Sequence, residues 1–162
     1  MIYLCAKHRD DMNIVRAPIE NPRDSLDELE RSKLHYAANN GSSLLVLQLI
    51  NDGIDINAQD AIGWTPLHFA AQNSHFAIID LLLEYNANPN LHDKQGNGPL
   101  WIAAMSILKS SHGVESLLKT GANPDHKNHH GRTPFYIANT IKKELKEVFE
   151  FYTDLNKKKE CL

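Results

Sequence analysis

One motif recurs along this 162-residue chain at a nearly constant interval. Thr65–Ala71 reads Thr-Pro-Leu-His-Phe-Ala-Ala, and a related stretch, Leu34–Ala38, lies 33 residues earlier. Further copies follow at Pro99–Ala104, 33 residues later, and at Thr133–Ala138, after an interval of 35 residues. A period of this length indicates a fold that stacks one small structural unit several times.

The motif itself predicts a short helix. Thr65 can accept a hydrogen bond from an unpaired backbone N–H of the first turn, and Pro66 stands at the first helical position, where proline is favoured. Leu67, Ala70 and Ala71 then fall on one face of the helix. Because the alanines are small, a neighbouring helix can approach this face closely.

A second helix is predicted in the second half of each unit. Asn86 follows it at the place where Gly53 and Gly121 stand in the neighbouring units, and where helices often end in a left-handed residue. Each helix pair is too small to bury its own apolar face, so stacking on neighbours must complete the core. The apolar face of the second helix in the central unit consists of Ile78, Ile79, Leu82 and Leu83.

These motifs share one register, and from about residue 31 to about residue 140 the chain resembles ankyrin-repeat proteins. The resemblance implies an all-α solenoid of stacked helix-turn-helix units with β-hairpin-like tips, about four repeats and a C-terminal capping helix. It also implies that His35 and His68 are structural residues that tie turns together. The expected segments are an N-terminal extension or cap (1–30), repeats at 31–60, 61–93, 94–128 and 129–140 onward, and a capping helix with a tail (141–162).

The third unit departs from the pattern. Gly98 replaces the threonine of the motif and Trp101 replaces its histidine. The interval from Ala104 to Val114 is two residues longer than the equivalent interval in the second unit. We therefore expect an extended helix or turn between the two helices of this unit.

The start of the chain is less regular. Residues 1–24 show no match to the repeat. Ser25 could open a helix through a capping box, and this helix could run straight into Leu34–Ala38. Alternatively, Ser32 caps the first helix and residues 25–30 form a separate turn. The sequence leaves both interpretations open.

Composition indicates a globular chain without membrane spans. No stretch approaches the ~20 apolar residues that cross a bilayer, and Met1–Ala6 is too short for a signal peptide. Cys5 and Cys161 lie at opposite ends of the chain, which predicts two free thiols and no disulfide framework. We therefore expect a cytoplasmic protein that binds no membrane.

The charge distribution is uneven although the net charge is only −3. Residues 36–93 contain six acidic residues and no lysine or arginine. Such an asymmetry would attract a partner with a basic surface. Alternatively, some of these carboxylates bond their own turns or lie on the second helices. The six acids are Asp52, Asp55, Asp60, Asp80, Glu84 and Asp93.

The resemblance implies that a partner protein meets the tips and the first helix of each unit. Trp64 stands out among these positions, because a tryptophan on a tip is typical of an interface anchor. The alternative is that Trp64 packs against the neighbouring tip. The expected partner-binding residues are Tyr36, Asn39, Asn40, Ala61, Ile62, Trp64, Phe69, Gln72, Asn73, Lys94, Gln95, Asn97, Ile102, Met105, His129, His130 and Arg132.

Other chemistry finds little support. His126, His129 and His130, with His92 one tip earlier, raise the question of a metal, but only Asp125 stands nearby as a further ligand. No motif of nucleophilic, phosphate-binding or metalloprotease chemistry occurs. A contiguous basic stripe is absent outside the C-terminal helix, which disfavours nucleic acid. We expect a non-enzymatic binding protein without metal or cofactor.

A finer resemblance is to short bacterial ankyrin proteins that serve as immunity proteins beside polymorphic toxins. It depends on Gly96–Trp101, Gly-Asn-Gly-Pro-Leu-Trp, and on Ile137–Ile141, Ile-Ala-Asn-Thr-Ile. It implies a monomer that binds one cognate toxin domain in a one-to-one complex and blocks its active site. The alternative is a general ankyrin adaptor with a regulatory partner.

Overall fold

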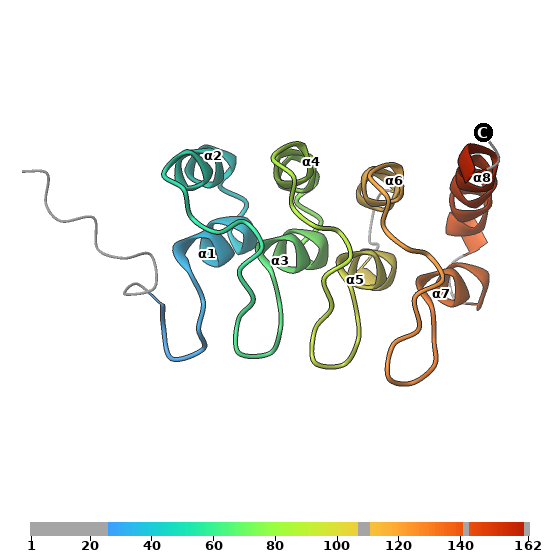
Figure 1. Ribbon diagram of the computed structural model, residues 1–162, viewed down its shortest axis with the longest axis horizontal. Coiled ribbons are helices and arrows are strands. Elements are labelled where there is room, and N and C mark those ends of the chain that lie inside the picture. The colour runs from blue at the N-terminus through green and yellow to red at the C-terminus, as the bar shows by residue number, and fades with distance from the viewer. Residues whose placement is uncertain (1–25, 107–110, 141–142, 161–162) are drawn as a thin grey trace, which may run out of the picture.

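The helices stack into a two-row solenoid (Figure 1). The computed structural model describes residues 26–106, 111–140 and 143–160, which contain eight helices and no strand. The odd-numbered helices form one row with four loops, here called the tips, extending beyond it, and the even-numbered helices form the other row (Figure 1). This arrangement confirms the all-α repeat solenoid. The helices are α1 (Lys33–Asn39), α2 (Ser43–Asn51), α3 (Pro66–Gln72), α4 (Phe76–Glu84), α5 (Pro99–Ser106), α6 (His112–Lys119), α7 (Pro134–Thr140) and α8 (Lys143–Glu160).

Local sequence explains where the helices begin and end. Thr65 is the N-cap residue of α3 and Pro66 follows it at the first helical position. Asn86 takes a left-handed conformation after α4, with φ of 64°, as the glycines do in the units on either side. The side chain of asparagine makes this conformation less costly than it is for most residues.

The core runs without a break through all four units. The odd-numbered helices pack on one another in sequence, and α4 packs against both α2 and α6. Alanine pairs on the odd-numbered helices are buried, so the helices can approach closely. The buried alanines of the first three units are Ala37, Ala38, Ala70, Ala71, Ala103 and Ala104.

Two buried histidines join the first unit to the second and the second unit to the third, as the resemblance implied. His35 accepts a hydrogen bond from the Ser32 backbone N–H through Nδ1 (3.0 Å), and its Nε2 donates to the carbonyl oxygen of Trp64 (3.1 Å). His68 repeats the arrangement one unit later, with Nε2 donating to the carbonyl oxygen of Asn97 (3.2 Å). Burial lowers the pKa of both imidazoles, so both are neutral near pH 7.

The tips are built around one acceptor side chain each. Oδ1 of Asp60 accepts the backbone N–H groups of Ile62 and Trp64, at 3.0 and 2.8 Å. Oδ1 of Asp27 accepts two N–H groups in the same pattern, so the first tip begins at Asp27. Ser32 is the N-cap residue of α1. From residue 26 onward, a separate turn therefore precedes α1, and Ser32 caps the helix, as the second interpretation had it. Ser25 lies outside the described residues.

Glu30 offers a test of tip geometry. It has φ of 58° at the position where the other tips carry Gly63, Gly96 and Gly131. A side chain with a Cβ is strained in this conformation, so Glu30→Gly should stabilise the protein by about 1 kcal/mol. Urea unfolding at pH 7 measures the change. Glu30→Ala is the control, because it removes the charge and keeps the Cβ; an equal gain in both variants would contradict a conformational cause.

The third unit contains the expected insertion. Five positions separate α5 from α6, against three between α3 and α4. Residues 107–110 of this connection lie outside the described residues. Gly113 on α6 lies against α4, because an added Cβ would be 3.0 Å from Cδ1 of Ile79.

The C-terminal helix closes the last unit. Leu145 and Phe149 of α8 are buried, and the ring of Phe149 lies 6.1 Å from that of Phe135. The opposite side of α8 is polar apart from exposed residues such as Phe151. This pattern is that of a terminal helix with one solvated face. Among the described residues, no helix is both long and apolar enough to cross a membrane.

Candidate partner-binding surface

The four tips lie side by side because backbone hydrogen bonds join them. The N–H of Ala61 donates to the carbonyl oxygen of Leu29 (2.8 Å), and the N–H of Lys94 donates to that of Ile62 (3.0 Å). The third bond runs from His129 to Gln95, at 3.0 Å. These bonds use backbone atoms only, so the tip side chains remain available to a partner.

The odd-numbered helices add exposed side chains beside the tips. Tyr36 and Met105 are large, partly apolar and exposed. Asn39, Asn73 and Gln72 are exposed amides at the ends of α1 and α3, and Nδ2 of Asn73 donates to Oδ1 of Asn39 (3.1 Å). Apolar groups flanked by fixed amides suit a protein partner, since the amides can bond its backbone.

Trp64 is not the exposed anchor considered above, because it packs between tips. Its side chain is half-buried, its ring stacks on His68 with centroids 5.9 Å apart, and Nε1 donates to Oδ2 of Asp93 (3.2 Å). The alternative interpretation, packing against the neighbouring tip, matches this geometry. Because its ring contacts His68 and Phe69 and its Nε1 bonds Asp93, Trp64 stabilises the packing of the tips.

Phe69 lies in the core instead of on the exposed face expected for it. The Arg31 guanidinium lies 5.1 Å from the centre of its ring, and His35 and Trp64 meet the ring edge-on. Arg31 also pairs with Asp60 through Nε and Oδ2 at 3.2 Å. The side chain of Phe69 is therefore covered by the preceding unit.

The remaining expected residues divide into two groups. Asn97 is held within the tips, because Oδ1 accepts a bond from Nδ2 of Asn128 (2.9 Å) and its backbone N–H donates to Asp93. Ala61 and Ile102 are half-buried. The exposed residues of the expected surface are Tyr36, Asn39, Asn40, Ile62, Gln72, Asn73, Lys94, Gln95, Met105, His129, His130 and Arg132.

Comparison with known families decides the identity of the repeats. A model of ankyrin repeats in three copies matches residues 2–93 and 34–128. The chain belongs to the ankyrin-repeat family. No curated protein matches the chain in a search among them. Ankyrin repeats indicate a protein–protein interaction module, as the sequence predicted.

The family match extends further toward the start of this ankyrin protein than the recurring motif does. Residues 1–24 showed no match to the repeat by inspection, but the family model extends to residue 2. The prolines at 18 and 22 and the missing Thr-Pro-Leu-His motif conceal the similarity. The match therefore begins before the first copy of the recurring motif.

Two exposed residues of the ankyrin surface were absent from the expected set. Leu29 lies on the first tip at the position of Ile62 in the second, and both side chains are exposed. The spacing of 33 residues between them could have identified Leu29. Tyr136 on α7 is also exposed, and the Arg132 guanidinium lies 5.9 Å from the centre of its ring.

The acidic residues of 36–93 do not gather on this surface, and their positions match the alternative interpretation, in which they bond their own turns or lie on the second helices. Asp60 is buried against Arg31, and Asp93 bonds the third tip. Asp80 on α4 accepts bonds from His112 (2.8 Å) and Ser116 (2.6 Å), in the other row of helices. The exposed carboxylates of the stretch lie on the second helices, at Asp80 and Glu84, or after them, at Asp52 and Asp55. On the tips, the exposed acids are instead Glu28 and Glu30, both on the first.

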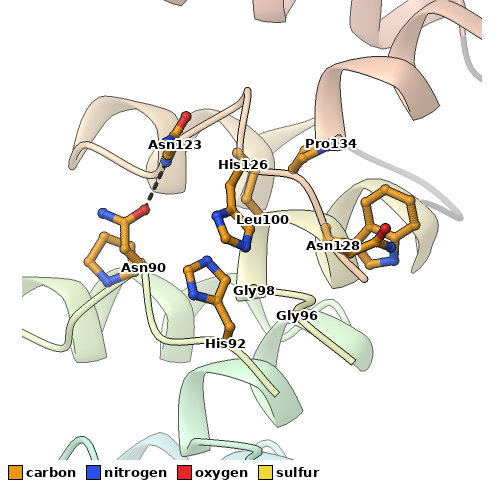
Figure 2. Close-up of a pocket in the computed structure, with 11 residues that line it drawn as sticks. Asn90, His92, Gly96, Gly98, Leu100, Asn123, His126, Asn128 and Pro134 are labelled. Atoms are coloured by element: carbon orange, nitrogen blue, oxygen red, sulfur yellow. Dashed lines mark hydrogen bonds between the residues drawn. The ribbon is translucent and has the colours of Figure 1, made fainter. Parts of the chain in front are cut away.

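Two of the histidines considered for metal binding line a small pocket between tips (Figure 2). The rings of His92 and His126 stack with centroids 3.6 Å apart, and the Asn123 N–H donates to Oδ1 of Asn90 beside them. Burial and then the neighbouring His126 lower the pKa of His92. The pocket volume of about 10 Å³ is near the minimum for one water. Within the described part of the chain, no three potential ligands are grouped to hold a metal.

Proposed function

We propose that this ankyrin protein binds a toxin domain across its tips and odd-numbered helices and neutralises the toxin by covering its active site. The observation that carries the proposal is that the tips and the odd-numbered helices expose apolar and amide side chains on that face. Leu29 and Ile62 provide it on the tips, and Tyr36 and Met105 provide it on the helices. Exposed apolar groups surrounded by polar ones are typical of protein interfaces.

The choice of a toxin as the partner is supported by two stretches of sequence. Gly96–Trp101 and Ile137–Ile141 resemble the corresponding stretches of short bacterial ankyrin immunity proteins. Gly96 has φ of 79°, and an added Cβ would be 3.1 Å from Cα of Asn128, so the third tip requires glycine there. Part of this resemblance therefore reflects packing, and the partner must be tested directly.

Charge on the tips supports a defined orientation of the partner. Glu28 and Glu30 are exposed on the first tip, whereas Lys94 and Arg132 are exposed on the third and fourth. A partner that places a basic patch against the first tip would be attracted in one orientation. The interaction should therefore weaken at high salt, mainly through slower association.

The double variant Ile62→Ala and Met105→Ala tests the surface. Both side chains are exposed, so their truncation should leave folding intact. If they contact the toxin at the centre of the interface, affinity should fall by about 30-fold or more. Calorimetry with a toxin domain encoded beside this chain measures affinity, and growth of cells that co-express the toxin measures neutralisation.

Phe151→Ala is the matched control, because it removes an exposed aromatic from α8 in the other row. It should bind and protect as the unaltered chain does. Wild-type affinity in the double variant would show that the toxin binds elsewhere. Binding of several unrelated proteins, without protection from any toxin, would instead support the adaptor alternative.

A further inference from the structure

The sequence contains two Asn-Gly pairs whose surroundings differ. Asn40–Gly41 connects α1 to α2, whereas Asn97–Gly98 ends the third tip, directly before α5. Asparagine is among the thermally labile residues of proteins. Its side chain is lost as ammonia most readily when glycine follows, because no side chain then hinders the next backbone nitrogen from approaching the amide. The two pairs therefore share one chemistry and can be compared by their packing.

Hydrogen bonds hold both the backbone and the side chain of Asn97. Its Oδ1 accepts from Nδ2 of Asn128 (2.9 Å), and its carbonyl oxygen accepts from Nε2 of His68 (3.2 Å) and from the backbone N–H of Asp93 (2.9 Å). Its own backbone N–H and Nδ2 donate to the Asp93 carboxylate, at 2.8 and 3.4 Å. Asn97 can therefore change its conformation only if the third tip opens.

Asn40 is held much less firmly. Asn40 and Gly41 are both exposed. Within the described part of the chain, the side chain of Asn40 makes one hydrogen bond, in which Oδ1 accepts from Nδ2 of Asn39 (3.1 Å). Asn39 is itself exposed, so water competes for this bond and the bond opposes rotation of the Asn40 side chain only weakly.

Packing between units requires glycine after Asn40. Gly41 has φ of 77°, and an added Cβ would lie 2.9 Å from Cε1 of His75. The imidazole is fixed there because its Nε2 donates to the carbonyl oxygen of Asn39 (3.0 Å). The Asn-Gly pair at this position therefore follows from the way in which the second unit packs on the first.

We propose that Asn40 is a site of spontaneous deamidation and that the third tip protects Asn97 from the same reaction. The backbone nitrogen of Gly41 attacks Cγ of Asn40, the Cγ–Nδ2 bond breaks, and the amide leaves as ammonia with the proton of the attacking nitrogen. Water then opens the resulting succinimide to aspartate or isoaspartate. Asn40 has ψ of −3°, so the attack requires rotation about its Cα–C bond. At an exposed helix end, this rotation needs only local opening.

The reaction changes the surface on which Asn40 lies. It replaces a neutral amide by a carboxylate at the C-terminal end of α1, where the helix dipole disfavours negative charge. The isoaspartate product also routes the backbone through Cβ, which shifts Gly41 relative to His75. The inference does not depend on a toxin as the partner.

Peptide mass spectrometry of the full-length chain, incubated at a mildly alkaline pH, tests the proposal. The peptide with Asn40 should convert from amide to acid at least ~10-fold faster than the peptide with Asn97. In urea the two rates should be similar, because both asparagines precede glycine. Equal rates in the folded protein, or conversion of Asn40 in urea alone, would overturn the proposal.

Asn40→Gln is the control for the site. It keeps an amide but lengthens the side chain by one methylene, so ring closure is slower and the peptide should remain unconverted. Conversion at an unchanged rate would overturn the assignment, because Asn39 would then be the reacting residue.

Asn128→Asp is the control for protection by the tip. It keeps the Oδ1 that accepts the backbone N–H groups of His130 and Arg132, and it removes the Nδ2 that donates to Asn97. Conversion of Asn97 should accelerate in this variant, while that of Asn40 should not change. An unchanged ratio of the two rates would also overturn the proposal, because the bonds of Asn97 would then give no protection.

Discussion

Lowering the pH from 6.5 to 4 is expected to destabilise this protein by about 3 kcal/mol through one side chain, His68. Burial lowers the pKa of its imidazole from 6.5 to about 4. The folded protein therefore keeps His68 neutral between these values, while the unfolded chain takes up a proton. This contribution to stability is complete above pH 6.5 and is lost as the pH falls through 4. Urea unfolding followed by circular dichroism at several pH values measures it.

Two variants separate the titration of His68 from its packing. His68→Leu cannot titrate, so its stability should change less between pH 6.5 and 4, although it should be less stable at pH 7 because the bonds to Thr65 and Asn97 are lost. Ile78→Ala should also lower stability, by about 3 kcal/mol, but it should keep the pH dependence of the unaltered protein. Part of that dependence should persist in both variants, because burial also lowers the pKa of His35. The same pH dependence in His68→Leu and the unaltered protein would contradict the assignment.

Gly63→Ala is expected to destabilise the protein by about 3 kcal/mol. Gly63 has φ of 87°, which strains any residue with a Cβ. An added Cβ would also lie 2.9 Å from Cα of Asp93 and 3.1 Å from the backbone nitrogen of Lys94, both in the next tip. Backbone atoms cannot move aside as a flexible side chain can. The variant should therefore disturb the bond between Lys94 and Ile62 that joins these tips.

Gly131→Ala is the matched control for this effect. Gly131 occupies the same place in the fourth tip, with φ of 69°, but an added Cβ would meet nothing within 4 Å. It should cost only the conformational strain, about 1 kcal/mol. Hydrogen exchange at the amide of Lys94 should accelerate in Gly63→Ala and not in Gly131→Ala. Equal losses of stability in the two variants would show that the close approach between tips has no energetic weight.

The repeats could be predicted from sequence because their determinants are local and recur. Thr65, Pro66 and Asn86 act within a few residues, so each was interpretable without knowledge of the neighbouring units. The choice between Ser25 and Ser32 as helix start is different. It depends on the first tip, which is joined to the second by the bond between Leu29 and Ala61. A long-range bond of this kind leaves no local motif.

The binding surface was harder to predict because equivalent positions have different neighbours. Tyr36 and Phe69 occupy the same place in successive units, yet Tyr36 is exposed and Phe69 is buried. Phe69 is covered by Arg31, a residue outside the repeat motif that also pairs with Asp60. Arg31 thus covers the ring of Phe69 and pairs with the carboxylate of Asp60, and both side chains are buried. Position within the repeat therefore identifies the face of a helix, but exposure depends on the unit before it.

Because the bonds between tips are made by backbone atoms, the spacing of the tips does not depend on which side chains the tips carry. Leu29, Ile62 and Gln95 each contribute a carbonyl oxygen to the row of tips, and their side chains take no part in those bonds. The backbone bonds therefore fix the distance between successive tips, while the side chain on each tip can vary. A library randomised at these three positions should retain the fold and change which protein is bound. Specificity in this molecule can thus be altered one tip at a time.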